Sequence, residues 1–109
     1  KGERMELERR EECYRKFLKV FGEEAQIMLA IEEMSELTKE LCKYFRAKGD
    51  SDKLEKVKEN IIEETADVLT ITETLRLMFG EEQVDEMMER KILRGQERCE
   101  EKLNKNNIS

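Results

Sequence analysis

The sequence has 109 residues, which predicts a single domain, and 44% of them are charged, 38% hydrophobic and 6% aromatic. It contains no proline and only five glycines, a composition typical of long helices with few breaks. The net charge of −6 comes from 27 acidic and 21 basic residues that are interspersed, which argues against a disordered acidic tail and against stable binding to a nucleic-acid backbone.

Three short turn signals divide the chain into four predicted helices. The tetrapeptide FGEE occurs at 21–24 and again at 79–82, and each copy places a glycine just before an acidic helix start. Between them, AKGDSD at 47–52 offers Gly49 as a C-terminal cap and Ser51 or Asp52 as an N-cap. The predicted fold is an all-α four-helix bundle, a single domain over 1–109, completed by oligomerisation. Its helices span 3–20, 23–47, 52–79 and 81–103, and a polar, frayed tail follows over about 104–109.

The helix predicted over 23–47 is apolar on one wide arc and acidic on another side. Because this arc is wide, we expect α-helical partners both from the same chain and from a second copy. The arc consists of Ile27, Ala30, Ile31, Met34, Leu37, Leu41 and Phe45. A second row along the helix reads Gln26, Leu29, Glu33, Glu36, Glu40 and Lys43.

The helix predicted over 52–79 carries a glutamate in its apolar seam, within the stretch IIEETADVL at 61–69. The seam recurs at 3- and 4-residue steps, and its members are Val57, Ile61, Glu64, Val68, Ile71, Leu75 and Met78. Asn60 and Asp67 lie at its edge. A short loop makes this helix the antiparallel neighbour of the one before it, which can bring Glu33 and Glu36 opposite Glu64 and Asp67.

Two interpretations of Glu64 follow from the residues. One is an ion pair with a Lys or Arg across the bundle, and the other is a divalent-metal site, because gathered carboxylates either raise one another's pKa values or need cations. All-oxygen ligands favour Mg²⁺, Mn²⁺ or Ca²⁺. The chain has no histidine, and its three cysteines lack C-x-x-C spacing, which argues against zinc and di-iron sites.

The acidic spacing is weak evidence when it stands alone. Glutamate is so frequent that about one E-E-x-x-E is expected by chance, and Glu82 with Asp85 repeats the E-x-x-D spacing at a helix start. Placement separates the two E-x-x-D pairs, because Glu64 interrupts an apolar seam and Glu82 does not.

Both motifs, in this order and in these hydrophobic surroundings, resemble the MazG-like all-α nucleoside triphosphate pyrophosphohydrolases, which are related to dimeric dUTPases and phosphoribosyl-ATP pyrophosphohydrolases. The family pattern is E-E-x-x-E, a spacer, then E-x-x-D. It is met by Glu32, Glu33 and Glu36, then by Glu64 and Asp67, with 27 residues between the motifs. The resemblance covers about residues 13–100.

The resemblance implies a Mg²⁺-dependent (Mn²⁺ is an alternative) hydrolase that cleaves a nucleoside triphosphate between its α- and β-phosphates. It implies Glu33, Glu36, Glu64 and Asp67 as metal ligands, with Glu32 either a further ligand or the residue that orients the water, so Glu32 and Glu36 are the catalytic candidates. Basic residues of the last helix would hold phosphates, and Lys91 and Arg94 are the candidates here, although a solvated helix face explains them equally well.

The family also implies contacts from Gln26 and Asn60 to base or sugar, for which structural hydrogen bonds are the alternative. It is usually dimeric or tetrameric, so a homodimer or homotetramer is expected. The alternative function is a noncatalytic helical assembly or adaptor module, whose acidic side chains would face solvent or form inter-helix ion pairs.

No apolar run approaches the roughly 20 residues of a membrane span, and no signal peptide is recognised in a sequence that begins at Lys1. We therefore expect a cytoplasmic protein with reduced cysteines and without a membrane or nucleic-acid partner.

Overall fold

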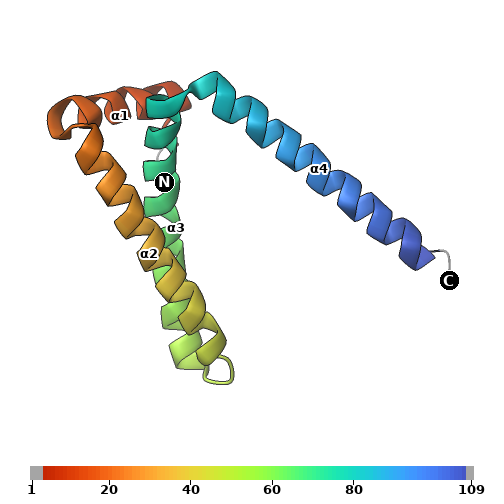
Figure 1. Ribbon diagram of the computed structural model, residues 1–109. Helices are drawn as coiled ribbons and strands as arrows, with labels where there is room; N and C mark the ends of the chain where they lie inside the picture. Colours follow the sequence, from red (N-terminus) through yellow and green to blue (C-terminus); the bar gives the residue numbers. More distant parts are fainter. Residues whose placement is uncertain (1–3, 108–109) are drawn as a thin grey trace. The chain divides into compact units, whose positions relative to one another are not determined.

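The computed structural model describes residues 4–107, and these residues form four α-helices and no strand. The helices are α1 (Leu7–Phe21), α2 (Glu23–Arg46), α3 (Ser51–Phe79) and α4 (Glu81–Asn107) (Figure 1). The all-α prediction is confirmed. No helix in the described part of the chain is long and apolar enough to cross a membrane.

The chain divides into two compact units, residues 1–78 and residues 79–109, and each is described by itself. The first unit holds α1, α2 and nearly all of α3. The second is essentially α4, a helix that continues through Asn107, four residues beyond its predicted end. Residues 104–107 include no glycine or proline, so none of them interrupts the helix. The single domain over 1–109 stays a prediction.

The first turn forms at Gly22, where φ is 91° and ψ is 160°. This φ is in the range that favours glycine, and the Gly22 N–H donates to the Leu18 carbonyl at 2.9 Å, closing α1 as the FGEE signal predicts. The start of α1 was predicted at residue 3. The helix begins at Leu7 instead, because the backbone of Glu6 is extended, with ψ at 153°.

The turn between α2 and α3 is capped differently from the prediction. Ala47 is the C-cap of α2, while Gly49, at φ 94°, supplies the left-handed residue of the turn. The predicted N-caps of α3, Ser51 and Asp52, are both inside the helix. Asp50 caps it, because its side-chain oxygen accepts the Lys53 N–H at 3.2 Å.

Helices α2 and α3 run antiparallel and side by side, as predicted. Helix α1 crosses this pair at the end opposite the turn that joins α2 to α3 (Figure 1). Two ion-pair clusters fasten α1 to α3. Arg10 donates to both carboxylate oxygens of Glu73, at 3.0 and 3.1 Å, and Arg76 pairs with Glu11 at 2.6 Å. The buried Tyr14 hydroxyl also donates to Glu73. Burial alone would raise the pKa of Glu73, but the hydrogen bonds from Arg10 and Tyr14 hold it below its ordinary value.

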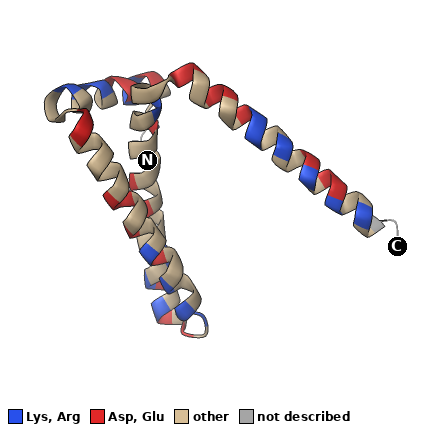
Figure 2. Ribbon diagram, in the orientation of Figure 1, with Lys and Arg blue, Asp and Glu red and all other residues tan. Residues whose placement is uncertain are grey.

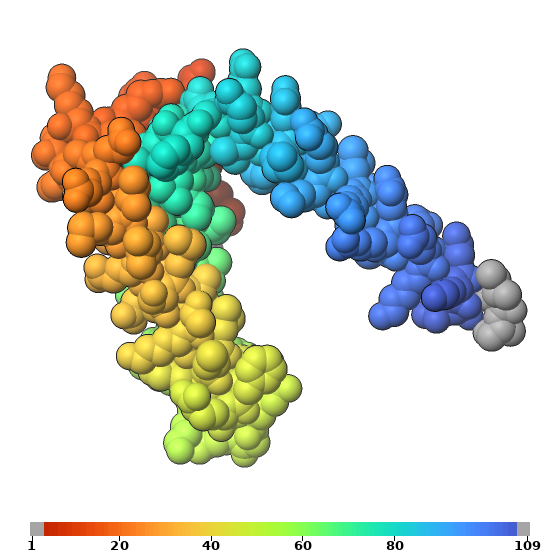
Figure 3. Space-filling view, in the orientation of Figure 1, coloured from red at the N-terminus to blue at the C-terminus, as the bar shows by residue number. Residues whose placement is uncertain are grey.

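The predicted apolar arc of α2 is divided between a covered and an uncovered part. The buried residues of α2 are Gln26, Ala30 and Glu40, and the apolar Ile27 and Leu37 are half-buried. Much of the apolar arc is uncovered within the chain: Ile31 is 60% exposed, and Phe45 is 70% exposed. In Figure 3, α2 lies at the surface in this view, coloured orange to yellow. One antiparallel neighbour covers only a narrow strip of a helix, so the rest of a wide arc stays open.

Candidate functional site: a carboxylate cluster beside an apolar pocket

The apolar seam of α3 brings Glu64 to the interface with α2. Every predicted member of the seam is buried or half-buried, from Val57 to Met78. Glu64 is half-buried within it, and Asp67, one turn further along, is exposed at its edge. Glu33 reaches the same place from α2, because the helices are antiparallel. Carboxylate oxygens of Glu33, Glu64 and Asp67 lie within 4.8 Å of one another.

Two oxygens of this cluster have no partner. Glu33 Oε2 and Glu64 Oε2 are buried, and neither has a hydrogen-bond donor among the described residues. Unpaired buried acceptors are rare in native structures, because each loses its bonds to water without a replacement. No Lys or Arg in the described range lies within ion-pair distance of Glu64. The ion-pair interpretation of Glu64 therefore has no support here.

The electrostatics of the cluster disfavour its ionised form without a cation. The pKa of Glu33 is raised to about 7. Burial is the largest cause, followed by hydrogen bonding and charge repulsion from Asp67 and then by the charges of Glu64 and Glu32. Burial, followed by the charges of Asp67 and Glu36, also raises the pKa of Glu64. Such a cluster holds a proton near neutral pH unless a cation replaces it.

The remaining acidic candidates lie at the edge of the cluster. Glu32 and Glu36 are exposed on α2, and neither belongs to the close group of three, although their charges act on Glu33 and Glu64. Their predicted roles as catalytic residues, and that of Glu36 as a ligand, remain predictions.

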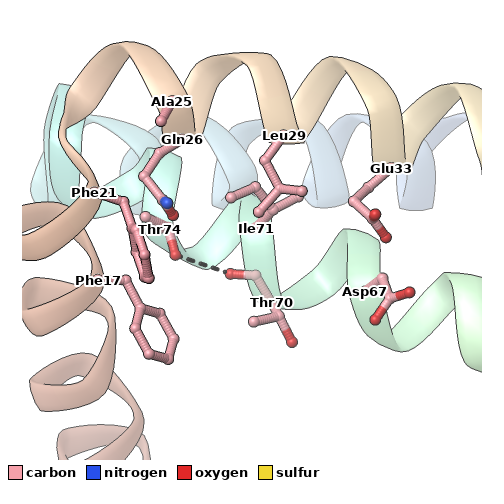
Figure 4. Close-up of a pocket in the computed structure, with 10 residues that line it drawn as sticks. All are labelled: Phe17, Phe21, Ala25, Gln26, Leu29, Glu33, Asp67, Thr70, Ile71 and Thr74. Carbon is pink, nitrogen blue, oxygen red and sulfur yellow. Dashed lines mark hydrogen bonds between the residues drawn. The ribbon is translucent and has the colours of Figure 1, made fainter.

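A mainly apolar pocket of about 570 Å³ adjoins the cluster. Glu33 and Asp67 face each other at one end of it, and Phe17 and Phe21 from α1 lie at the other (Figure 4). The remaining lining comes from α2 and α3: Ala25, Gln26, Leu29, Thr70, Ile71 and Thr74. Its size and apolar character suit an aromatic ring system, and pockets of roughly 300–1,000 Å³ are typical of small-molecule sites.

The predicted substrate-binding residues separate into three groups. Gln26 is 5% exposed and lines the apolar pocket, where a base or sugar contact is sterically reasonable. Asn60 does not line that pocket; its side-chain amide instead donates to Glu40 at 3.2 Å, the structural hydrogen bond that was the alternative. Lys91 and Arg94 are exposed on α4, in the other unit, and stay predictions.

Sequence reasoning missed Phe17 and Phe21 as pocket residues. The only available signal was their i, i+4 spacing at the end of a helix, which places both on one side. It also missed that Glu40 is buried, 7% exposed, and held by Lys43 at 3.2 Å and by Asn60. Lys43 lies at i, i+3 from Glu40, so this contact is local to α2.

Comparison with protein-family models, with curated proteins and with solved structures found no match. The resemblance to the MazG-like enzymes therefore depends on the two acidic motifs and their surroundings alone.

The raised pKa of Glu33 predicts how stability depends on pH. The folded-state pKa of about 7 lies above the ordinary value of 4.5. Between these two pH values the folded protein binds more protons than the unfolded protein, so its stability falls as the pH rises through this range. In EDTA, the melting temperature should drop between about pH 5 and pH 8, and Glu33→Gln should remove this part of the drop. Added Mg²⁺ should raise the melting temperature more at the higher pH, because protons then compete less for the carboxylates. An equal pH slope in the parent and in Glu33→Gln would contradict the assignment.

Proposed function

We propose that the protein is a Mg²⁺-dependent nucleoside triphosphate pyrophosphohydrolase, which cleaves (d)NTP between the α- and β-phosphates to (d)NMP and pyrophosphate. The observation that carries the proposal is the group formed by Glu33, Glu64 and Asp67, with two buried oxygens that lack donors. Its position at one end of an apolar pocket supports a substrate with a ring at one end and phosphates at the other.

The residues present fit a hard divalent cation, since all three donors are carboxylates and no cationic side chain among residues 4–107 pairs with them. Glu33, Glu64 and Asp67 would hold Mg²⁺ or Mn²⁺, with Glu36 one turn beyond Glu33 as a further ligand. When bound, such an ion neutralises phosphate charge and acidifies a coordinated water.

The chain's own residues supply positioning and a proton acceptor. The walls of the apolar pocket, from Phe21 to Thr74, hold the nucleoside away from water, with the Gln26 amide available for a base or sugar atom. Water attacks the α- or the β-phosphorus in line, and a new P–O bond forms as the bond from that phosphorus to the α–β bridging oxygen breaks. The bridging oxygen leaves with pyrophosphate when the α-phosphorus is attacked, and with the nucleotide when the β-phosphorus is attacked. Glu32 is exposed beside the cluster and takes the proton of the attacking water.

The test is a panel of NTPs and dNTPs with Mg²⁺, scored for release of pyrophosphate and for the matching monophosphate. We expect pyrophosphate from at least one substrate and none in EDTA. Release of orthophosphate and a diphosphate instead would contradict cleavage at the α–β bond. If no substrate turns over and Mg²⁺ leaves the melting temperature unchanged, the noncatalytic assembly module becomes the better interpretation.

The exposed face of α2 leads us to propose a homodimer or homotetramer as the functional unit. Its apolar members are between 41% and 70% exposed, and they follow one side of the helix at helical spacing: Met28, Ile31, Met34, Leu41 and Phe45. A face of this length on a helix that already has a neighbour matches the interface of a helical bundle formed by two chains.

Sedimentation should therefore show a dimer or larger species at micromolar concentration. Ile31→Lys combined with Phe45→Lys should shift the protein to monomer and lower activity, because two charges cannot be buried in such an interface. Lys39→Ala, on the same helix, serves as the control and should change neither. A fully active parent monomer at micromolar concentration would contradict the proposal.

A further inference from the structure

A second pocket lies at the turn between α2 and α3, and it has the opposite character from the apolar one. Its volume is about 530 Å³, and four of its seven lining residues are cationic: Lys43, Arg46, Lys53 and Lys56, with Ala47, Val57 and Asn60. In the ribbon of Figure 2, blue segments of both helices gather beside this turn, while red segments occupy the middle of α2. In a protein of net charge −6, such a concentration of positive charge in a hollow requires an explanation.

The acidic neighbours do not neutralise these cations. Lys56 lies 3.8 Å from Glu59, but both side chains are mostly exposed, and such pairs contribute little. Arg46 and Lys53 have no carboxylate within ion-pair distance among residues 4–107. The Asp50 carboxylate accepts the backbone N–H of Lys53, so it is engaged in capping α3.

Glu40 contacts two lining residues of this basic pocket, Lys43 and Asn60. One of its oxygens accepts from Lys43 at 3.2 Å and the other from Asn60 at 3.2 Å. Both of its acceptor atoms are therefore occupied, and they hold side chains from α2 and α3 in fixed positions. Four of the lining residues are cationic and none is acidic, and only Lys43 and Lys56 have an ion-pair partner, Glu40 and Glu59, among residues 4–107.

We propose that the basic pocket binds an inorganic polyphosphate-type anion, with diphosphate as the smallest good ligand, at a site distinct from the carboxylate cluster. The Arg46 guanidinium offers a planar fork that matches phosphate oxygens, and Lys53 and Lys56 add point charges from the facing helix. The pocket volume leaves room for more than one phosphate group, and the concave arrangement favours a compact anion over an extended nucleic-acid backbone.

The proposal does not depend on hydrolysis, so the test is performed without metal or nucleotide. Sodium diphosphate is titrated calorimetrically into the full chain in EDTA at low salt. The parent should bind, and Arg46→Ala combined with Lys53→Ala should weaken binding at least about tenfold. Both residues are exposed, so the circular dichroism should be unchanged. Lys53→Arg should retain binding.

The matched control is Lys39→Ala combined with Lys58→Ala, which removes two charges from the same helices outside the pocket. It should change the affinity by no more than about twofold, as a general charge effect would. Three outcomes would overturn the proposal: no binding by the parent, equal weakening by the two double variants, or tighter binding of a single-stranded oligonucleotide that is lost in the same pocket variant. Glu64→Gln should leave diphosphate binding in EDTA intact, which separates this site from the proposed catalytic one.

Discussion

Asp67→Asn should reduce pyrophosphate release by more than about 100-fold, because each 1.4 kcal/mol of lost transition-state stabilisation is tenfold and a metal ligand supplies several. The amide keeps the size of the side chain but removes the anionic oxygen that lies within 4.8 Å of Glu33 and Glu64. Since Asp67 is exposed, the helical circular dichroism should be unchanged.

Asp52→Asn is the matched control, because it removes the same charge from an exposed position of α3 far from the cluster. It should leave turnover within about twofold, as surface substitutions usually do. Glu36→Gln should also abolish hydrolysis if Glu36 is a ligand, and its exposed position makes this the more demanding half of the prediction. Normal turnover in Asp67→Asn or in Glu36→Gln would contradict the role assigned to that residue.

Glu64→Leu should give a protein that folds as well as the metal-free parent, or better, and that has no activity. The buried Oε2 of Glu64 lacks a donor, and no cationic side chain of the described range pairs with it, so leucine strands no partner. An apolar side chain between Ile61 and Val68 restores the seam of α3. The variant should also lose most of the rise in melting temperature that Mg²⁺ gives to the parent.

Thermal melts of the parent and of Glu64→Leu, each in EDTA and in Mg²⁺, test this prediction. Glu40→Leu is an informative contrast, because Glu40 is a buried glutamate whose two oxygens are both paired. It should melt below the parent in EDTA, since its loss leaves Lys43 and Asn60 without their acceptor. A Glu64→Leu variant that melts well below the EDTA parent and still responds to Mg²⁺ would show that Glu64 has a structural role.

The sequence by itself determined the helices and the main members of the cluster. Glycines and acidic helix starts in FGEE placed all four boundaries near Gly22 and Gly80 to within a residue, because these signals act locally. The 3- and 4-residue repeat of α3 identified Glu64 as a seam residue, and the short connection made α2 its antiparallel neighbour. Those two facts were sufficient to predict that Glu33 meets Glu64 and Asp67.

Only the tertiary structure decided how much of the apolar arc of α2 is covered within the chain. Of the predicted arc, Ala30 is buried and Ile27 and Leu37 are half-buried, whereas Ile31 and Phe45 are 60% and 70% exposed. A helical pattern shows that a face is apolar, but it does not say whether the same chain or another copy covers it. Glu40 and Glu64 illustrate the same limit, because both are glutamates at the interface of α2 and α3. Lys43 and Asn60 donate to Glu40, whereas the buried Oε2 of Glu64 has no donor among the described residues. Hydrogen-bond partners 20 residues apart depend on how two helices pack, which no local pattern records.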